Sequence, residues 1–227
     1  MGLCHWITDG ETHRVSSPRA SKMAELLEST FRIVNRSFAN GMALLCATMS
    51  RRIWEASEAA NTKPFGLMPS CSGSGLGGHC IPLDSFHLFP TAREHDFATQ
   101  FIDPAGESDD RMPPRVIEIL AALRKPISEA EVLLLGATYK RNIDDVRESA
   151  VPKIAHLLRR RGAQPAYEAP HVPSVTPGQE PMPSADLTGE RLASPDLVRV
   201  ATGTWRMTVC RRCSIREAGQ AVWRRTT

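Results

Sequence analysis

The chain has 227 residues, 41% of them hydrophobic and 23% charged, and a formal charge of +3 at pH 7. These are ordinary values for a globular protein that is long enough to bury a core in one or two domains. The small net charge gives no indication of a nucleic-acid partner, and no run of about 20 apolar residues predicts a membrane helix. The first residues lack the apolar core of a signal peptide, so we expect a soluble, cytoplasmic protein.

A long helix is the first element that the sequence predicts. Residues 22–60 contain no proline, and apolar side chains recur there at helical intervals. We expect this helix to start within "RASKM" and to break near residues 49–52. The apolar stripe comprises Leu27, Phe31, Val34, Phe38, Met42 and Leu45. Because the stripe is too wide for one thin domain to bury, we predict that it forms the core of a homodimer.

The middle of the chain changes from a helical pattern to an α/β pattern. Helices are expected in "SFHLFPTAREH" and "RMPPRVIEILAALRK". A buried strand over residues 131–135, a helix over residues 151–161 and a second strand in "QPAYEA" then form a β-α-β unit, the usual start of a parallel sheet. The predicted fold class is a mainly α helical domain followed by a partial α/β Rossmann-like domain and a disordered C-terminal tail.

Four segments follow from these patterns. They are an irregular N-terminal remnant at 1–18, a central helical domain at 19–125, a partial Rossmann-like domain at 126–202 and a poorly ordered tail at 203–227. Order fades after Pro170, where prolines are frequent, and the tail has neither a helical nor a strand period. We therefore expect the tail not to pack against the β-α-β unit.

The cysteines give little sign of a disulfide framework or a metal site. A chain of this size without an export signal is expected to keep its six cysteines as thiols. Cys210 and Cys213 have the spacing of half a zinc site, but no second C-x-x-C and no histidine pair follows them. We predict no bound metal.

A glycine run in "SGSGLGGHCIPLD", residues 72–84, is the candidate functional motif. Gly73, Gly75 and Gly78 match G-x-G-x-x-G, the dinucleotide pattern. A dinucleotide loop needs a strand before it and a helix after it, whereas prolines precede this run and Pro82 stands where the helix would begin. We interpret it as a loop of close approach. The polar residues that it presents are His79, Cys80 and Asp84.

Four segments, in their order and spacing, resemble nucleotide-sugar 6-dehydrogenases of the UDP-glucose/GDP-mannose dehydrogenase family. They are "ESTFRIVNRSFANGMALLC", "NTKPFGLMP", "GSGLGGHCIPLDSFHL" and "LLLGATYKRNIDDVRESAVPKI". The resemblance covers residues 14–173 and is greatest to the branch that acts on UDP-N-acetylmannosamine and UDP-N-acetylglucosamine. It implies NAD-dependent oxidation of the sugar's C6 hydroxyl to a carboxylate, with a UDP-sugar as ligand.

The resemblance also implies an architecture. Members have an N-terminal NAD-binding domain, a central helical domain that forms the dimer, and a C-terminal UDP-binding Rossmann-like domain. Because residue 14 already matches the segment before the central helix, we expect the NAD-binding domain to be absent here.

Site residues follow from the same motifs. The resemblance implies that Cys80 is the nucleophile, through a thiohemiacetal and a thioester, and that Asp84 orients water for hydrolysis. It places Gly75, Gly77, Gly78 and Lys140 at the substrate and Arg147 at the cofactor's phosphates. From the residues alone, Asp84 could instead cap a helix, and Arg147 could pair with Asp144 or Asp145. His79 could lower the pKa of the thiol or lie at the surface.

Departures from the family pattern weigh against activity. Glu25 and Ser29 stand where the family has a lysine and an asparagine at the reacting oxygen, which reverses the charge there. Lys22 is three residues from Glu25, roughly 300° around the helix, and is expected to face elsewhere. Ser72 and Ser74 replace prolines and should loosen the loop.

The departures lead to one prediction and three rivals. We predict a dehydrogenase fragment that is inactive alone. Two of the rivals are non-enzymatic remnants, either a helical dimerisation module that pairs with an intact homologue or a pseudogene product with no role, and the third is an isolated UDP-sugar binder.

Overall fold

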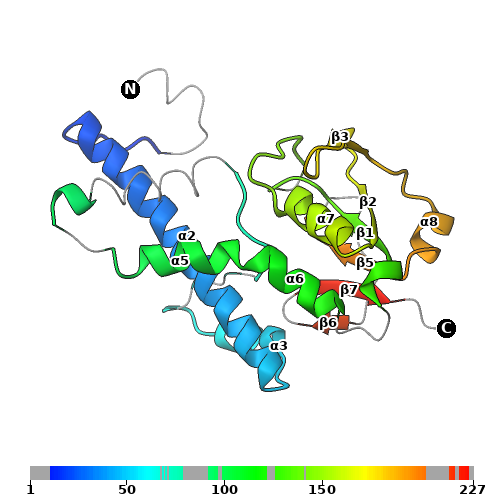
Figure 1. Ribbon diagram of the computed structural model, residues 1–227. Coiled ribbons are helices and arrows are strands. Elements are labelled where there is room, and N and C mark those ends of the chain that lie inside the picture. The colour runs from blue at the N-terminus through cyan, green and yellow to red at the C-terminus, as the bar shows by residue number, and fades with distance from the viewer. Residues whose placement is uncertain are drawn as a thin grey trace.

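The computed structural model describes residues 11–66, 68, 70, 72–78, 92–96, 99–121, 126–140, 142–202, 215–217 and 220–224. Its helical part and its sheet lie at opposite ends of the view in Figure 1, and the α5–α6 segment runs from one to the other. The predicted fold class, a helical region followed by a small parallel sheet with helices, is confirmed. Among the described residues, no helix combines the length and the apolar character needed to cross a bilayer.

The long helix and its break are confirmed. Helix α2 spans Pro18–Thr48 and α3 spans Ile53–Ala60, so the interruption falls where the sequence predicts it. The predicted start was too late, because α2 begins at a Ser-Pro pair. The Ala20 N–H donates to Ser17 Oγ at 3.2 Å, and Pro18 occupies the first turn, where a missing N–H costs nothing.

Helix α2 packs along α5 (Ile102–Asp110) through small and polar side chains. Ser37 Oγ donates to the Ala105 carbonyl at 2.7 Å, which fixes the two backbones close together. The residues that α2 buries are Ser29, Ile33, Ser37, Asn40 and Ala43. The predicted apolar stripe lies elsewhere on the helix, and its large members Leu27, Phe31, Phe38 and Leu45 are exposed.

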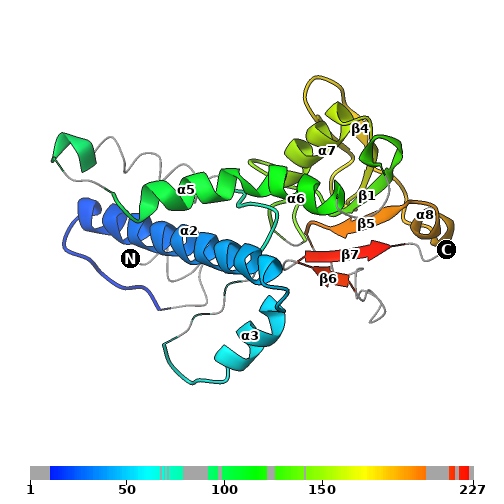
Figure 2. The ribbon, with the colours of Figure 1, turned by 60° about the horizontal axis from the view of Figure 1, so that its bottom comes forward.

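Helix α6 (Met112–Ala121) continues from α5 and reaches the sheet (Figure 2). It packs against α7 (Ala150–Arg160) and confirms the helix predicted in "RMPPRVIEILAALRK". The helix predicted in "SFHLFPTAREH" falls mostly outside the described residues, of which residues 92–94 are helical.

The sheet has the strand order β2-β1-β5-β7-β6. Strand β1 (Glu131–Leu135) pairs in parallel with β2 (Gln164–Glu168) and with β5 (Leu197–Val200), and α7 connects β1 to β2. The predicted β-α-β unit is therefore confirmed. The smaller elements are η1 (Ile127–Glu129), β3 (Ser174–Val175), β4 (Met182–Pro183) and α8 (Gly189–Ala193).

The main core lies between this sheet and helices α6 and α7. Val132 and Leu134 of β1 and Leu197 of β5 point into it, beside Ile154 and Leu158 of α7. The alternate residues of β1 and β5 point to the opposite face, where a smaller apolar cluster forms. This alternation, with period two, puts Arg199 on the same face of β5 as Leu197.

The expectation that order fades after Pro170 was wrong. Order continues past Pro170 to β5, and β7 (Gln220–Arg224) pairs antiparallel with β5 and with β6 (Ile215–Glu217). The two described strands of the tail therefore join the sheet at β5, and their pairings are with β5 and with each other rather than with β1 or β2 of the β-α-β unit. An open strand edge on β5 can accept any extended segment, whether or not that segment has a clear strand period of its own.

Candidate functional site

The glycine loop, residues 72–78, packs tightly against the segment after β1. A Cβ on Gly77 would lie 2.5 Å from Tyr139 Cβ and 3.0 Å from the Glu148 carbonyl oxygen. A Cβ on Gly78 would lie 2.9 Å from the Tyr139 ring, and the φ of Gly78 is +94°. At these two positions the glycines therefore admit a neighbouring part of the protein, as the close-approach interpretation predicts. Residues 61–66 and 72–78 contain no strand that could precede a dinucleotide loop.

Hydrogen bonds to the rest of the chain fasten this loop along its length. The Gly73 N–H donates to Asn40 Oδ1 of α2 at 2.9 Å, and the Leu76 N–H donates to both carboxylate oxygens of Asp109 of α5 at 2.8 and 2.7 Å. The Gly78 N–H donates to the Arg147 carbonyl at 3.0 Å. The loop is thus tied to both the helical part and the α/β part.

Ser74 provides a further tie, to the sheet itself. Arg199 Nη2 of β5 donates to Ser74 Oγ at 2.8 Å, and both side chains are buried. The serine that was expected to loosen the loop is therefore a hydrogen-bond acceptor. A proline at this position would have no such oxygen.

Two ionisable groups at the loop have shifted pKa values. Burial raises the pKa of Asp109 above its usual value, and the Leu76 hydrogen bond and the Arg36 charge oppose that rise. Burial lowers the pKa of Arg199 to about 9, because the guanidinium is removed from water. Each shift disfavours the charged form of its side chain.

Lys140 and Arg147 lie on the segment between β1 and α7, which ends at the cap residue Ser149. Lys140 is exposed and directly follows Tyr139. The Arg147 guanidinium contacts the Asp145 carboxylate through three hydrogen bonds of 2.7 to 3.1 Å. The ion-pair alternative for Arg147 is therefore present, with Asp145.

Glu25 and Ser29 lie one turn apart on α2, as expected. Ser29 is fully buried, whereas Glu25 is half exposed. Lys22 Nζ lies 3.1 Å from Glu25 Oε2, so the expectation that Lys22 faces elsewhere was wrong. A separation of roughly 300° in one direction is roughly 60° in the other, and residues three apart are neighbours on a helix.

Cys80, Asp84 and His79 lie outside the described residues, so their roles stay predictions. In the part of the chain that is described, no group of three or more histidine, cysteine, aspartate or glutamate side chains is placed to hold a metal ion.

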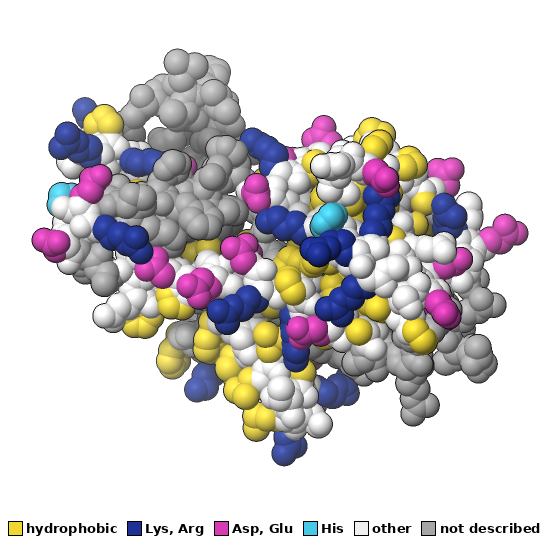
Figure 3. All heavy atoms as spheres, in the orientation of Figure 1, with side chains coloured by type: hydrophobic (Ala, Val, Ile, Leu, Met, Phe, Trp, Pro, Cys, Tyr) yellow, Lys and Arg dark blue, Asp and Glu magenta, His cyan; other side chains and the backbone are white. Residues whose placement is uncertain are grey.

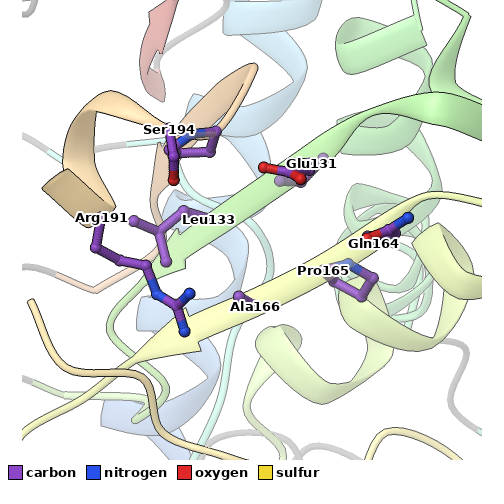
Figure 4. Close-up of a pocket in the computed structure, with 9 residues that line it drawn as sticks. Glu131, Leu133, Gln164, Pro165, Ala166, Arg191 and Ser194 are labelled. Atoms are coloured by element: carbon purple, nitrogen blue, oxygen red, sulfur yellow. The ribbon is translucent and has the colours of Figure 1, made fainter.

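A separate pocket of about 230 Å³ opens where β1 and β2 begin. Figure 4 shows Glu131 and Gln164 at the starts of these strands and the Arg191 guanidinium over Ala166. Ligands of parallel α/β sheets bind at the carboxyl ends of the strands. The glycine loop lies toward that other end, beside Thr138 and Thr202, and is therefore the better candidate.

Four residues around the loop were not predicted from the sequence: Asn40, Asp109, Tyr139 and Arg199. Asn40 shares a helix face with Ser29 and Ser37, and this polar row within an apolar helix was a usable signal. No sequence pattern near Asp109 predicts its role, because its hydrogen-bond partner Leu76 is 33 residues away.

The chain matches two models of one family. Residues 19–111 match the UDP-glucose/GDP-mannose dehydrogenase family, central domain, and residues 133–208 match the UDP binding domain of the same family. The boundary between the two matches falls between α6 and β1, where the helical part gives way to the sheet.

Individual relatives agree with these models. The chain is 32% identical over 165 residues to a UDP-N-acetyl-D-mannosamine dehydrogenase of Methanococcus maripaludis, covering 72% of this chain and 37% of that protein. It is 36% identical over 154 residues to the Escherichia coli enzyme of the same name, covering 63% and 35%. A solved UDP-D-ManNAc dehydrogenase of Pyrococcus horikoshii superimposes with a TM-score of 0.74 at 27% identity, covering 92% of this chain and 49% of that one.

Proposed function

Because the chain belongs to the UDP-glucose/GDP-mannose dehydrogenase family, we propose that it binds a UDP-sugar at the glycine loop, as part of a nucleotide-sugar 6-dehydrogenase. The observation that carries the proposal is the fastening of residues 72–78 to α2, α5 and β5, at the carboxyl edge of the parallel strands. The relatives are named for UDP-N-acetyl-D-mannosamine, so the ligand class we propose is a UDP-N-acetylhexosamine.

The substrate contacts in this proposal come from the loop and from Lys140. The loop backbone at Gly75, Gly77 and Gly78 is assigned to the sugar, and the exposed Lys140 ammonium can meet a phosphate as a point charge. Arg147 is the residue proposed for a cofactor phosphate, and that phosphate would have to replace Asp145 on its guanidinium.

The covalent step in this proposal belongs to Cys80, two residues after Gly78. Its thiolate adds to the aldehyde carbon at C6, and the thioester formed after the second oxidation is hydrolysed by a water that Asp84 orients. In the family reaction NAD supplies the oxidising equivalents. No dinucleotide loop occurs among the described residues, so no step is assigned here to that cofactor.

We propose further that the 227-residue chain does not reduce NAD by itself. Positioning of a reactant contributes about 7–11 kcal/mol to catalysis, and no dinucleotide loop that could position the nicotinamide occurs among the described residues. Glu25 and Ser29 also place a carboxylate and a short hydroxyl where the family motif has a cation and an amide. The test is NADH absorbance with UDP-N-acetylmannosamine and UDP-N-acetylglucosamine beside a Cys80→Ala control. Cys80-dependent NADH formation would contradict the proposal.

Substrate binding is tested separately by calorimetry with UDP-N-acetylglucosamine. Lys140→Ala should weaken binding at least tenfold, because it removes the proposed phosphate contact. Lys153→Ala is the matched control, since Lys153 is an exposed lysine of α7 that pairs with Glu148. Equal affinity in the two variants would remove Lys140 from the site, and no binding by the unmodified chain would favour the dimerisation module instead.

The exposed stripe on α2 supports a homodimer through this helix. Leu27, Phe31, Phe38 and Leu45 are exposed in the single chain and recur at intervals of four and seven residues. Figure 3 shows hydrophobic side chains gathered at the lower end of the helical part, around α3 and the adjoining end of α2. A second copy would remove such apolar surface from water.

A further inference from the structure

One of the largest fully buried side chains among the described residues is a charged one, Arg199 of β5. In the sheet it lies between Leu134 of β1 and Val222 of β7. Its Nη2 donates to Ser74 Oγ at 2.8 Å, whereas its Nε and Nη1 are buried without a hydrogen-bond partner in the described structure. Burial lowers the pKa of Arg199 to about 9, and no described carboxylate opposes that fall.

The stability of the fold does not account for an arginine at this position. The preceding residues of β5, Leu197 and Val198, are apolar and buried, as a strand inside a core requires. A buried cation without a counter-charge costs stability, and an apolar residue of similar volume in its place is often neutral or stabilising. A residue that breaks the local pattern at such a cost is typical of a functional site. The contact that Arg199 makes is with Ser74, in the glycine loop.

The bond to Ser74 ties the first half of the loop, residues 72–76, to the sheet. On either side of Ser74 the loop is held by the helical part, because the Gly73 N–H donates to Asn40 of α2 and the Leu76 N–H donates to Asp109 of α5. Arg199 ties the residue between them to the α/β part instead. Loss of this bond would leave the Gly73 and Leu76 contacts to move the loop with the helices.

The same strand also contacts the segment that leads to Lys140. Just beyond β5, the Thr202 N–H donates to the Leu135 carbonyl at 3.2 Å. The Thr202 hydroxyl donates to the Thr138 carbonyl, two residues before Lys140. The chain from Arg199 to Thr202 therefore contacts both the glycine loop and the Lys140 segment, which are the two parts of the proposed substrate site.

We propose that Arg199 is a positioning residue of the nucleotide-sugar site, which holds the glycine loop, through Ser74, at a fixed distance from the Lys140 segment. This role rests on the proposed function, because it requires that the loop and Lys140 meet one UDP-sugar. A site binds more tightly when its parts are already held in the bound arrangement. Arg199 thus strengthens binding without touching the ligand, at a cost to the stability of the free chain.

Calorimetry with UDP-N-acetylglucosamine, together with urea denaturation, separates positioning from a structural role. Arg199→Met should weaken binding at least tenfold and leave the free chain at least as stable as the unmodified one, because it removes a buried charge and keeps most of the volume. Loss of a structural contact alone would lower stability and leave the affinity of the folded chain unchanged. Ser74→Ala should weaken binding equally, and the double variant no further, since both changes remove one hydrogen bond.

Ser72→Ala is the matched control for Ser74→Ala. Ser72 Oγ is also buried in the loop, but it makes no hydrogen bond in the described structure. Amide hydrogen exchange compares the two variants without a ligand. The Gly73 and Leu76 amides should exchange at least tenfold faster in Ser74→Ala than in Ser72→Ala, whereas the Leu133 amide of β1 should exchange equally in both.

The outcomes distinguish this proposal from the proposed function. If the unmodified chain binds the nucleotide sugar and Ser74→Ala binds as tightly as Ser72→Ala, the positioning role is overturned and the proposed function stands. If the unmodified chain does not bind, the proposed function fails, and amide exchange decides whether Arg199 holds the loop. Equal exchange in the two serine variants overturns that role. If Arg199→Met does not fold, the serine variants decide alone.

Discussion

The helical part and the α/β part bury their apolar side chains very differently. Among the residues that the structure describes, fifteen of the eighteen in the main core lie after residue 129, whereas ten of the thirteen exposed large hydrophobic residues lie before residue 102. The α/β part therefore encloses its own core, and the helical part leaves its largest apolar side chains in water. The contrast indicates that the α/β part can be stable within one chain, while the helical part gains most from a second copy.

The buried face of α2 explains how the helical part holds together without a large core. Its contacts with α5 use Ser37 and Ala43 rather than large apolar residues, so the two helices approach closely and share a hydrogen bond. The same face carries Asn40, which holds the glycine loop. The face of α2 that carries Asn40 thus holds the glycine loop, and the exposed face that carries Phe38 is the one at which a partner could bind.

The largest effect should come from the core of the α/β part. Leu134→Ala removes a fully buried side chain at the centre of β1 and should lower the free energy of unfolding by about 2–5 kcal/mol. Leu187→Ala, at a partly exposed position, should cost less than about 1 kcal/mol. Urea denaturation measures both. Equal losses of unfolding free energy in the two variants would show that the α/β part does not depend on its buried core.

A change on the exposed face of α2 should separate association from folding. Phe38 is 64% exposed in the single chain, so Phe38→Asp should leave the monomer folded while lowering the dimer affinity at least 100-fold. Light scattering at micromolar concentration should then give a monomer mass. Ser21→Asp adds the same charge in the first turn of the helix and should leave the dimer intact. A folded monomer already in the unmodified chain would refute the proposed homodimer.

The elements that the sequence predicted are those with local, repeated signals. The helix of residues 22–60, its break and the β-α-β unit all have an apolar period, and each is confirmed. Strand β5 was not predicted because it has only four residues and contains Arg199. An arginine at a buried strand position does not fit the apolar pattern by which buried strands are recognised. The start of α2 was misplaced although the Ser17–Pro18 pair is a local signal that could have been used.

The site was predictable only in part, for a similar reason. The glycine loop and the residues after β1 stand out as motifs, and the structure brings Gly77 and Gly78 against Tyr139. The anchors Asp109 and Arg199 act across 33 and 125 residues of sequence, respectively. Such contacts depend on how the two parts pack, which no local pattern encodes.

A smaller effect should appear in the pH dependence of stability, through the loop anchor Asp109. Its pKa is raised in the folded chain by burial, so the unfolded chain loses this proton at lower pH than the folded chain. The resulting stabilisation is complete below pH 3.8 and is lost as the pH rises toward the folded pKa. Asp109→Asn keeps one acceptor for the Leu76 N–H and removes this titration.

Urea denaturation at pH 4 and pH 7 tests the Asp109 prediction. Relative to the unmodified chain, Asp109→Asn should be more stable at pH 7 than at pH 4. Asp186→Asn is the control, because Asp186 is exposed and is not among the groups that shift the Asp109 pKa. If the stability of Asp109→Asn relative to the unmodified chain does not change with pH, or falls as the pH rises, burial does not raise the pKa of Asp109 in the folded chain.

The most direct test asks whether the glycine loop, held between the two parts, is the nucleotide-sugar site. Calorimetry with UDP-N-acetylglucosamine would compare Gly77→Ala with Gly106→Ala. A Cβ at Gly77 would lie 2.5 Å from Tyr139 Cβ, whereas one at Gly106 of α5 meets nothing within 4 Å. We expect Gly77→Ala to lose at least tenfold in affinity and Gly106→Ala to bind as the unmodified chain does. Unchanged binding by a folded Gly77→Ala variant would contradict it.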